Sequence, residues 1–148
     1  MRDVCGTDNA NSTEFTHDCT PVISLITEWV KDGKSEMRDT NSDMGGTLRL
    51  GAYPCIIKPN TLAHKIYGAD KISERHRHRY ELNKEYEDLM AKNGMIISGR
   101  SPDGKLPEII ELNNHPFFIA GQFHPEFQSS PYTSHPLFAA FIKYAKDS

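Results

Sequence analysis

The sequence predicts one α/β domain, and two observations support this prediction. Short apolar segments with strand character alternate with segments whose apolar residues recur at helical spacing along most of the 148 residues. Turn and capping residues stand at the ends of many of these segments. The length suits one domain that buries a core, but the hydrophobic fraction of 37% is somewhat low, which suggests that a partner surface is missing.

The first part of the chain is mostly polar. Residues 1–5 are typical of the end of a helix, with Gly6 as terminator and no N-cap before them, and such an end without a beginning is expected of a truncated chain. A loop rich in capping residues follows over 11–15, and an apolar segment over 21–26. Charges of alternating sign over 31–46 predict a solvated surface loop.

Three helices are predicted from caps and periodicity. The first covers 62–67, with Asn60 or Thr61 as its cap and a glycine directly after it. The second runs from its cap at residue 83 to residue 92, with apolar side chains at the i, i+3, i+4 spacing of one buried face. The third is an amphipathic helix over 136–146 that closes the chain.

Strand patterns lie before and between these helices. Gly51 and Pro54 break the first two patterns, which suits an edge strand or a bulge. A turn with Pro and Gly at 101–104 joins two later strands. The predicted strands cover 48–50, 55–57, 95–98, 106–112 and the apolar run 117–123.

Composition excludes several classes of protein. The net charge of −3 argues against a general polyanion binder, and no apolar run approaches membrane-spanning length. The N-terminus has no apolar signal-peptide core. Cys5, Cys19 and Cys55 are odd in number and form no Cys-x-x-Cys pair, so neither a disulfide framework nor a zinc site is indicated. A reduced, cytoplasmic protein is therefore expected.

The run at 117–123 ends in His124-Pro125-Glu126. On an extended backbone, residues two apart project to the same side, so His124 and Glu126 can lie together. A neutral imidazole can shuttle a proton, and an adjacent carboxylate fixes its tautomer. The alternative interpretation is an ordinary ion pair at the rim of a strand, and spacing alone does not decide between the two.

A second polar run alternates arginine and histidine over residues 75–79. Read as a strand, it places Arg75, Arg77 and Arg79 on one face and the histidines on the other. Three like charges on one face require negative partners. Nucleic acid, a metal ion on the two histidines and a carboxylate-bearing small ligand are three candidates, and internal acids such as Glu74 or Glu81 are a fourth.

Four motifs in order identify a known family that the whole chain resembles. The chain is similar to the C-terminal glutaminase domain of CTP synthases, within the class I glutamine amidotransferases. The resemblance implies a flavodoxin-like mixed sheet with flanking helices, of which residues 1–148 would be a partial domain without the synthase domain. The motifs are NSTEF at 11–15, DMGGTLRLG at 43–51, ERHRHRYE at 74–81 and QFHPEF at 122–127.

The resemblance implies a role for four residues. His124 resembles the catalytic base and acid, and Glu126 the carboxylate that orients it. Arg79 resembles the arginine that holds the α-carboxylate of L-glutamine, and Glu14 the glutamate that answers its α-ammonium. The family passes the released ammonia to a synthase domain that uses ATP and Mg²⁺ to aminate UTP, so no cofactor or metal is expected on this chain.

The family's nucleophile is absent from the expected place. It is a cysteine on a strand-to-helix elbow that precedes the motif at 11–15 by about a helix length, and none of Cys5, Cys19 and Cys55 has such surroundings. The chain alone is therefore expected to hydrolyse no glutamine and to be marginally stable or sticky. The alternative is a non-catalytic glutamine-binding or regulatory module that associates with a synthase partner. Nucleic-acid binding is a third and weaker hypothesis.

Overall fold

The computed structural model describes residues 1–25, 28–31, 34–37 and 49–147. Its helices are α1 (Arg2–Cys5), α2 (Leu62–Tyr67), α3 (Glu87–Lys92) and α4 (Pro136–Asp147), with 3-10 turns η2 (Lys84–Tyr86) and η3 (Pro125–Gln128). Its strands are β1 (Ala10–Ser12), β2 (Thr20–Leu25), β3 (Glu28–Lys31), β4 (Lys34–Met37), β5 (Arg49–Ile57), β6 (Lys71–His78), β7 (Tyr80–Leu82), β8 (Met95–Arg100), β9 (Pro107–Leu112) and β10 (Ile119–Gly121).

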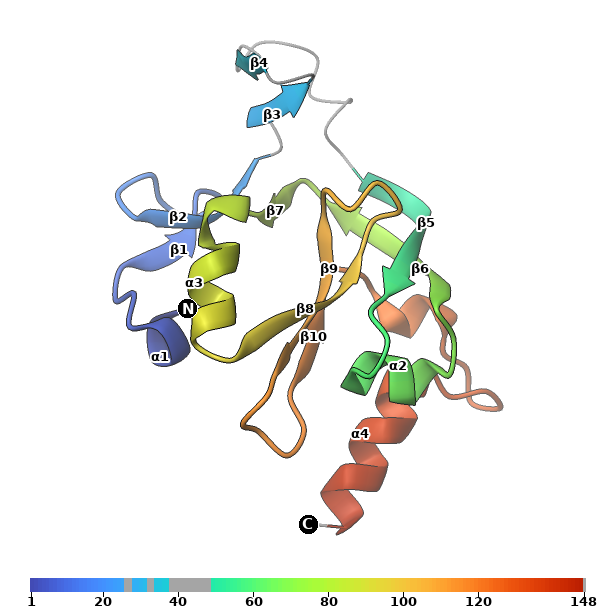
Figure 1. Ribbon diagram of the computed structural model, residues 1–148. Coiled ribbons are helices and arrows are strands. Elements are labelled where there is room, and N and C mark those ends of the chain that lie inside the picture. The colour runs from blue at the N-terminus through green and yellow to red at the C-terminus, as the bar shows by residue number, and fades with distance from the viewer. Residues whose placement is uncertain (26–27, 32–33, 38–48, 148) are drawn as a thin grey trace.

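The main sheet has five strands in the order β10-β9-β8-β5-β6, and all of its neighbours are antiparallel. A smaller sheet has the order β1-β2-β7, and β3 pairs with β4 alone (Figure 1). Only Arg79 separates β6 from β7. The chain therefore passes directly from the edge of the main sheet into the smaller sheet at this residue.

A small apolar core lies where the main sheet meets α2 and the segment after β10. Gly99 on β8 is required there, because a Cβ at this position would lie 2.8 Å from both Cys55 Sγ and Ile109 Cγ1. The helix α4 begins at this core and extends away from it (Figure 1). The buried core residues are Cys55, Ile57, Ala63, Ile109 and Phe123, and Tyr67, Ile72, Ile119 and Leu137 pack against them.

The predicted mixed α/β fold is confirmed, and so are most helix signals. Thr61 is the cap of α2, since its Oγ1 accepts a hydrogen bond of 3.2 Å from His64 N. Asn83 Oδ1 likewise accepts from Glu85 N at 3.1 Å, although the helix there opens as the 3-10 turn η2. Gly6 and Gly68 both end helices in the left-handed conformation, with φ of 64°.

The predicted break between 48–50 and 55–57 is wrong, because β5 runs unbroken from Arg49 to Ile57. Gly51 continues the strand with φ of +103°, which glycine adopts readily. Pro54 lies opposite Ser73, whose carbonyl points to the outer edge of β6. The missing N–H of Pro54 therefore costs no hydrogen bond to β6.

Two other predictions need correction. The surface loop predicted for 31–46 contains the end of β3 and all of β4, and its remaining residues lie outside the described part of the chain. The strand predicted for 117–123 is shorter, because the Ile119–Gly121 pairing with β9 ends before His124. In the part of the chain that the structure describes, no helix is long and apolar enough to cross a membrane.

Candidate functional site

The structure brings His124 and Glu126 into direct contact. His124 Nδ1 and Glu126 Oε1 are 2.7 Å apart. The contact is made through the turn η3 rather than along an extended strand, because Glu126 lies in its first half. A carboxylate accepts hydrogen bonds, so Nδ1 carries a proton in this contact and Nε2 of the neutral ring keeps its lone pair.

The pair lies near the surface. The His124 side chain is 40% exposed and that of Glu126 is 55% exposed. The backbone N–H of Glu126 and its hydrogen bond with His124 hold the pKa of the Glu126 carboxyl below its ordinary value. Glu126 therefore stays charged through the neutral range, as an orienting carboxylate must.

Arg79 and Glu14 lie at one end of the three-stranded sheet. In the register of that sheet, Ser12 at the end of β1 faces Ile23 and Tyr80 at the start of β7 faces Leu25. Glu14 follows β1 and Arg79 precedes β7, so both flank the same end of β2. Two strand spacings separate their backbones, which is roughly 10 Å.

The main sheet links this end to His124. The backbone N–H of His124 donates to the carbonyl of Arg75 at 2.8 Å, and Arg75 is four residues before Arg79 on the same extended run. Four extended residues span on the order of 13 Å. All four predicted site residues thus lie along one path, from η3 along β6 to the smaller sheet.

None of the three cysteines resembles a nucleophile. Cys55 is fully buried on β5, and burial together with the charge of Glu108 raises the pKa of its thiol to about 12. Cys19 Sγ donates to the carbonyl of Thr16 in the loop before β2, at 3.2 Å. Cys5 is the last residue of α1 and Gly6 ends that helix in the left-handed conformation, so Cys5 does not lie at the start of a helix.

The sequence did not predict a buried charged network that joins β5, β7 and β9. Arg49 donates to Glu108 at 2.7 Å and to Glu81 at 3.2 Å, and the side chains of all three are less than a tenth exposed. His78 Nε2 is 2.8 Å from the same Glu81 oxygen. Burial raises the pKa of Glu108, whereas Arg49 remains charged because the two carboxylates outweigh its own burial.

The network corrects one interpretation of the Arg-His run. Glu81 and Glu74 were candidates to neutralise Arg75, Arg77 and Arg79, but Glu81 bonds Arg49 and His78, while Glu74 bonds other side chains. The predicted alternation along β6 is confirmed, since Arg75 and Arg77 are exposed and His76 is buried. Glu74 shares the buried face of β6 with His76, and their two-residue spacing was the available signal in the sequence.

His76 and His78 do not form a metal site with other residues in the part of the chain that the structure describes. Among residues 1–25 and 49–147, no group of three or more His, Cys, Asp or Glu side chains is placed to hold a metal ion. His76 is completely buried and its Nε2 is 3.7 Å from Glu108 Oε2. Burial and the nearby Arg49 lower the pKa of His76 to about 3, so the ring is neutral.

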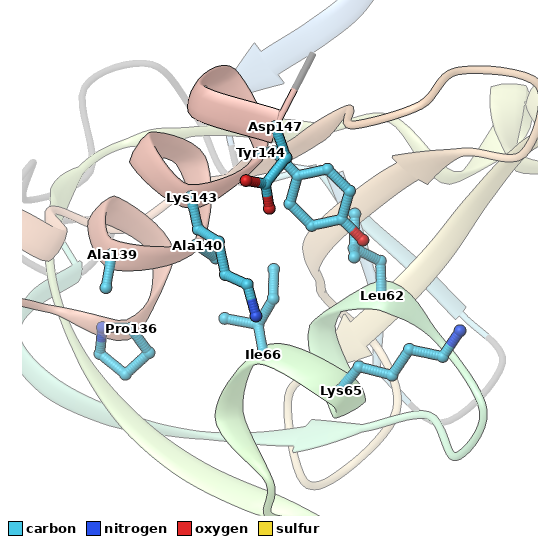
Figure 2. Close-up of a pocket in the computed structure, with 9 residues that line it drawn as sticks. All are labelled: Leu62, Lys65, Ile66, Pro136, Ala139, Ala140, Lys143, Tyr144 and Asp147. Atoms are coloured by element: carbon cyan, nitrogen blue, oxygen red, sulfur yellow. The ribbon is translucent and has the colours of Figure 1, made fainter.

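One hollow of the structure lies away from the pair. It is a groove of about 720 Å³ between α2 and α4, and Figure 2 shows side chains of the two helices facing each other across it. Its polar groups are Lys65, Lys143, Tyr144 and Asp147. A smaller apolar hollow of about 300 Å³ lies between β10 and α4, and Pro125 is one of the residues that line it.

Comparison with known proteins gives the class. The family described as glutamine amidotransferase class-I matches residues 17–144. The chain therefore belongs to the class-I glutamine amidotransferase family.

The more similar relatives indicate the branch of that family. The chain is 54% identical over 148 residues to a CTP synthase of Nitratidesulfovibrio vulgaris (strain DP4), covering 98% of this chain and 27% of the relative. It is 57% identical over 139 residues to a CTP synthase of Pelagibacter ubique (strain HTCC1062), covering 94% of this chain and 26% of the relative. The chain thus spans about a quarter of the length of these relatives.

A solved structure agrees. The glutaminase domain of Trypanosoma brucei CTPS, with bound acivicin, superposes with a TM-score of 0.81 at 30% identity, over 99% of this chain and 54% of that chain. The predicted resemblance to the glutaminase domain of CTP synthases is confirmed. The roles predicted for His124, Glu126, Arg79 and Glu14 stay predictions.

Proposed function

We propose that this chain is the glutamine-binding, His–Glu part of a glutaminase that releases ammonia for the ATP-dependent amination of UTP to CTP. The observation that carries the proposal is the 2.7 Å contact between His124 Nδ1 and Glu126 Oε1, in a chain that is 54% identical to a CTP synthase. The carboxylate at Nδ1 leaves Nε2 to accept and return a proton.

The four residues divide the work between chemistry and binding. A thiolate attacks the amide carbon of glutamine, and His124 gives a proton to the departing ammonia and then takes one from the attacking water. Glu126 stabilises the imidazolium form of His124. Arg79 binds the α-carboxylate of glutamine and Glu14 binds its α-ammonium, because a zwitterion requires one fixed charge of each sign.

The thiolate comes from a segment other than residues 1–148, either in a longer protein or in a partner chain. The burial of Cys55 and its thiol pKa of about 12 support this assignment, because only a thiolate attacks efficiently. The chain alone is therefore inactive. ATP and Mg²⁺ belong to the synthase part, with which this chain associates, and the chain itself needs no cofactor. The expected location is the cytoplasm.

The buried state of Cys55 also favours a second candidate function. A non-catalytic module needs no nucleophile, and it keeps glutamine recognition through Arg79 and Glu14 while it contacts a synthase partner. The two candidates differ in whether a complementary polypeptide restores glutamine hydrolysis.

The test measures glutamine binding and ammonia release separately. Calorimetry with the 148-residue chain should show binding that Arg79→Ala weakens at least about tenfold, since a charge-assisted hydrogen bond contributes ~1.5–3 kcal/mol. The control Arg77→Ala removes an exposed arginine of the same run and should leave the affinity unchanged. Ammonia release should not exceed that of His124→Ala.

Complementation then separates the two candidates. The remaining part of the Pelagibacter ubique CTP synthase, added as a second polypeptide, should restore ammonia release with the wild-type chain and not with His124→Ala. Binding of glutamine without restored release would favour the non-catalytic module. Absence of glutamine binding in both arrangements would contradict both candidates.

A further inference from the structure

Glu74 is a buried carboxylate that the proposed chemistry does not use. It lies on β6, is 2% exposed and accepts hydrogen bonds from three other segments. Its Oε1 accepts from Tyr67 Oη on α2 at 2.8 Å and contacts His135 Nε2, just before α4, at 2.8 Å. Its Oε2 accepts a hydrogen bond of 2.5 Å from Nε2 of Gln128, which is the last residue of η3. We call Glu74, Tyr67, Gln128 and His135 the Glu74 cluster.

Each neighbour of Glu74 is fixed as a donor. His135 Nδ1 accepts from Leu137 N at 3.2 Å, so the ring proton resides on Nε2 and points at Glu74. Burial and the Glu74 carboxylate raise the pKa of the Tyr67 hydroxyl above its ordinary value, so that group also keeps its proton. An amide NH₂ can only donate. A side chain that only accepts is therefore required at position 74.

The cluster reaches the His124–Glu126 pair through Gln128. The same Gln128 Nε2 also donates to the carbonyl of Ser73 at 3.0 Å. At the other end of η3, His124 N donates to the carbonyl of Arg75 at 2.8 Å. Because Ser73 and Arg75 are two apart on an edge strand, both carbonyls point outward, and η3 is attached to β6 at both of its ends.

Within the turn, the His124 ring contacts the Phe127 ring at 5.4 Å between centroids, and Phe123 directly before the turn is buried in the core. The pair itself is about half exposed, and η3 contains no buried residue. Its internal backbone bonds, Phe127 N to His124 O and Ser129 N to Glu126 O, are long at 3.2 and 3.3 Å. Phe127 itself belongs to η3, so the position of the turn on β6 depends on the attachment of its two ends.

We propose that Glu74 is a positioning residue: through Gln128 it holds η3 in the conformation in which the Glu126 carboxylate reaches His124 Nδ1. This inference rests on the proposed function only in that the His124–Glu126 pair is the group that acts. It assigns a role to a buried acid that touches neither glutamine nor the reacting atoms. Loss of the attachment frees the turn and separates the pair without removing either member.

The test reads the tautomer of His124 by long-range ¹⁵N–¹H NMR of the 148-residue chain, with no glutamine present. In the wild-type chain the neutral ring should carry its proton mainly on Nδ1, facing Glu126. Gln128→Ala removes both hydrogen bonds of the Gln128 amide, to Glu74 and to the Ser73 carbonyl, and it should lower the ratio of Nδ1–H to Nε2–H at least about threefold. Glu74→Gln should act in the same direction, because an amide cannot accept from all three donors.

Three further measurements make the result decisive. The pKa of Glu126, followed by its ¹³C carboxyl shift, should rise toward its ordinary value in Gln128→Ala. Two control variants should change neither the tautomer ratio of His124 nor the pKa of Glu126. Tyr132→Ala alters an exposed side chain in the loop between η3 and α4, and Glu87→Gln weakens the ion pair with Arg100. Gln128 is exposed, so Gln128→Ala tests the attachment of η3 even if Glu74→Gln does not fold, and Glu74→Gln tests the part of Glu74 in it.

The proposal is overturned if a folded Gln128→Ala keeps the wild-type tautomer ratio, or if Tyr132→Ala or Glu87→Gln shifts it equally. Failure of the proposed function would instead appear as absent glutamine binding in a wild-type chain whose His124 tautomer is as expected. The two failures are therefore distinguishable.

Discussion

The interior of the main sheet and the outer face of α4 distribute polar and apolar groups in opposite ways. Where the main sheet meets β7, the ionisable side chains of Arg49, Glu81 and Glu108 are each less than a tenth exposed. On α4, Phe141 is 57% exposed and Ile142 is 65% exposed. Neither arrangement follows the rule that apolar groups are buried and charges solvated.

The two regions teach different lessons about stability. The buried charges persist only because each has a partner, so the sheet depends on a complete network. Phe141 and Ile142 of α4 stay more than half exposed among the described residues, so their apolar area stabilises the fold little and is available to another surface. The smaller sheet lies beside the charged region, whereas Pro125 of η3 shares an apolar hollow with Phe138 and Phe141 of α4.

The largest effect should come from breaking the charged network. Arg49→Met leaves Glu81 and Glu108 buried without their cation, and we expect the free energy of unfolding to fall by about 3–5 kcal/mol. Urea unfolding at neutral pH, followed by circular dichroism, measures this loss. A loss of this size would show that folding depends on the charged network.

A matched control uses the ion pair between Arg100 on β8 and Glu87 on α3. Arg100 contacts Glu87 at 2.5 Å, but both side chains are a fifth to a third exposed. Arg100→Met should therefore cost about 1 kcal/mol or less. Equal losses in Arg49→Met and Arg100→Met would show that burial of the network adds nothing to its importance.

The second effect is a pH dependence that originates at His76. Its pKa is lowered to about 3 by burial and by Arg49, so the folded chain binds fewer protons than the unfolded chain between about pH 6.5 and pH 3. Above the pKa of His76 in the unfolded chain, this titration does not reduce the free energy of unfolding. As the pH falls through the window, the free energy of unfolding decreases by at most about 1.4 kcal/mol per pH unit.

His76→Phe removes this titration and keeps a ring between Tyr53 and Phe123, which contact His76 edge-on at 5.5 and 5.9 Å between ring centroids. The variant should lose less stability than the wild-type chain between pH 6.5 and pH 4, when the free energy of unfolding is measured by urea at each pH. Parallel curves for the two proteins would mean that His76 does not titrate in this window.

Local signals in the sequence were sufficient for the elements but not for their connections. Thr61, Asn83 and Gly68 predict their helix ends because caps depend on neighbouring residues alone. The unbroken β5 could not be predicted, because the tolerance of Pro54 depends on which edge of β6 faces it. Pairing register is a property of two distant segments.

The site shows the same division. Proximity of His124 and Glu126 follows from their spacing, although the turn η3 rather than a strand brings them together. The family resemblance indicated Arg79 and Glu14, and the three-stranded sheet places them at one end. The Arg49 network and the Glu74 cluster join residues up to 61 positions apart, such as Glu74 and His135, so no local pattern announces them.

The smallest effect on stability should come from the apolar face of α4. The double variant Phe141→Ser/Ile142→Ser removes the two most exposed large apolar side chains described on this helix, and the free energy of unfolding should change by less than about 0.5 kcal/mol. Self-association of the chain, measured by sedimentation velocity, should weaken at least about tenfold, since burial of apolar area drives it.

Leu137 provides the control on the same helix. It packs against the core cluster of Cys55, Ile57 and Ile109, so Leu137→Ala should cost about 2 kcal/mol or more and should not reduce self-association. If the double variant at positions 141 and 142 unfolded as readily as Leu137→Ala, the outer face of α4 would belong to the fold itself. If a stable double variant sedimented as the wild-type chain does, the exposed apolar area of α4 would not be the surface through which the chain associates. The outer face of α4 and the charged interior would then differ in composition, and this difference would play no part in assembly.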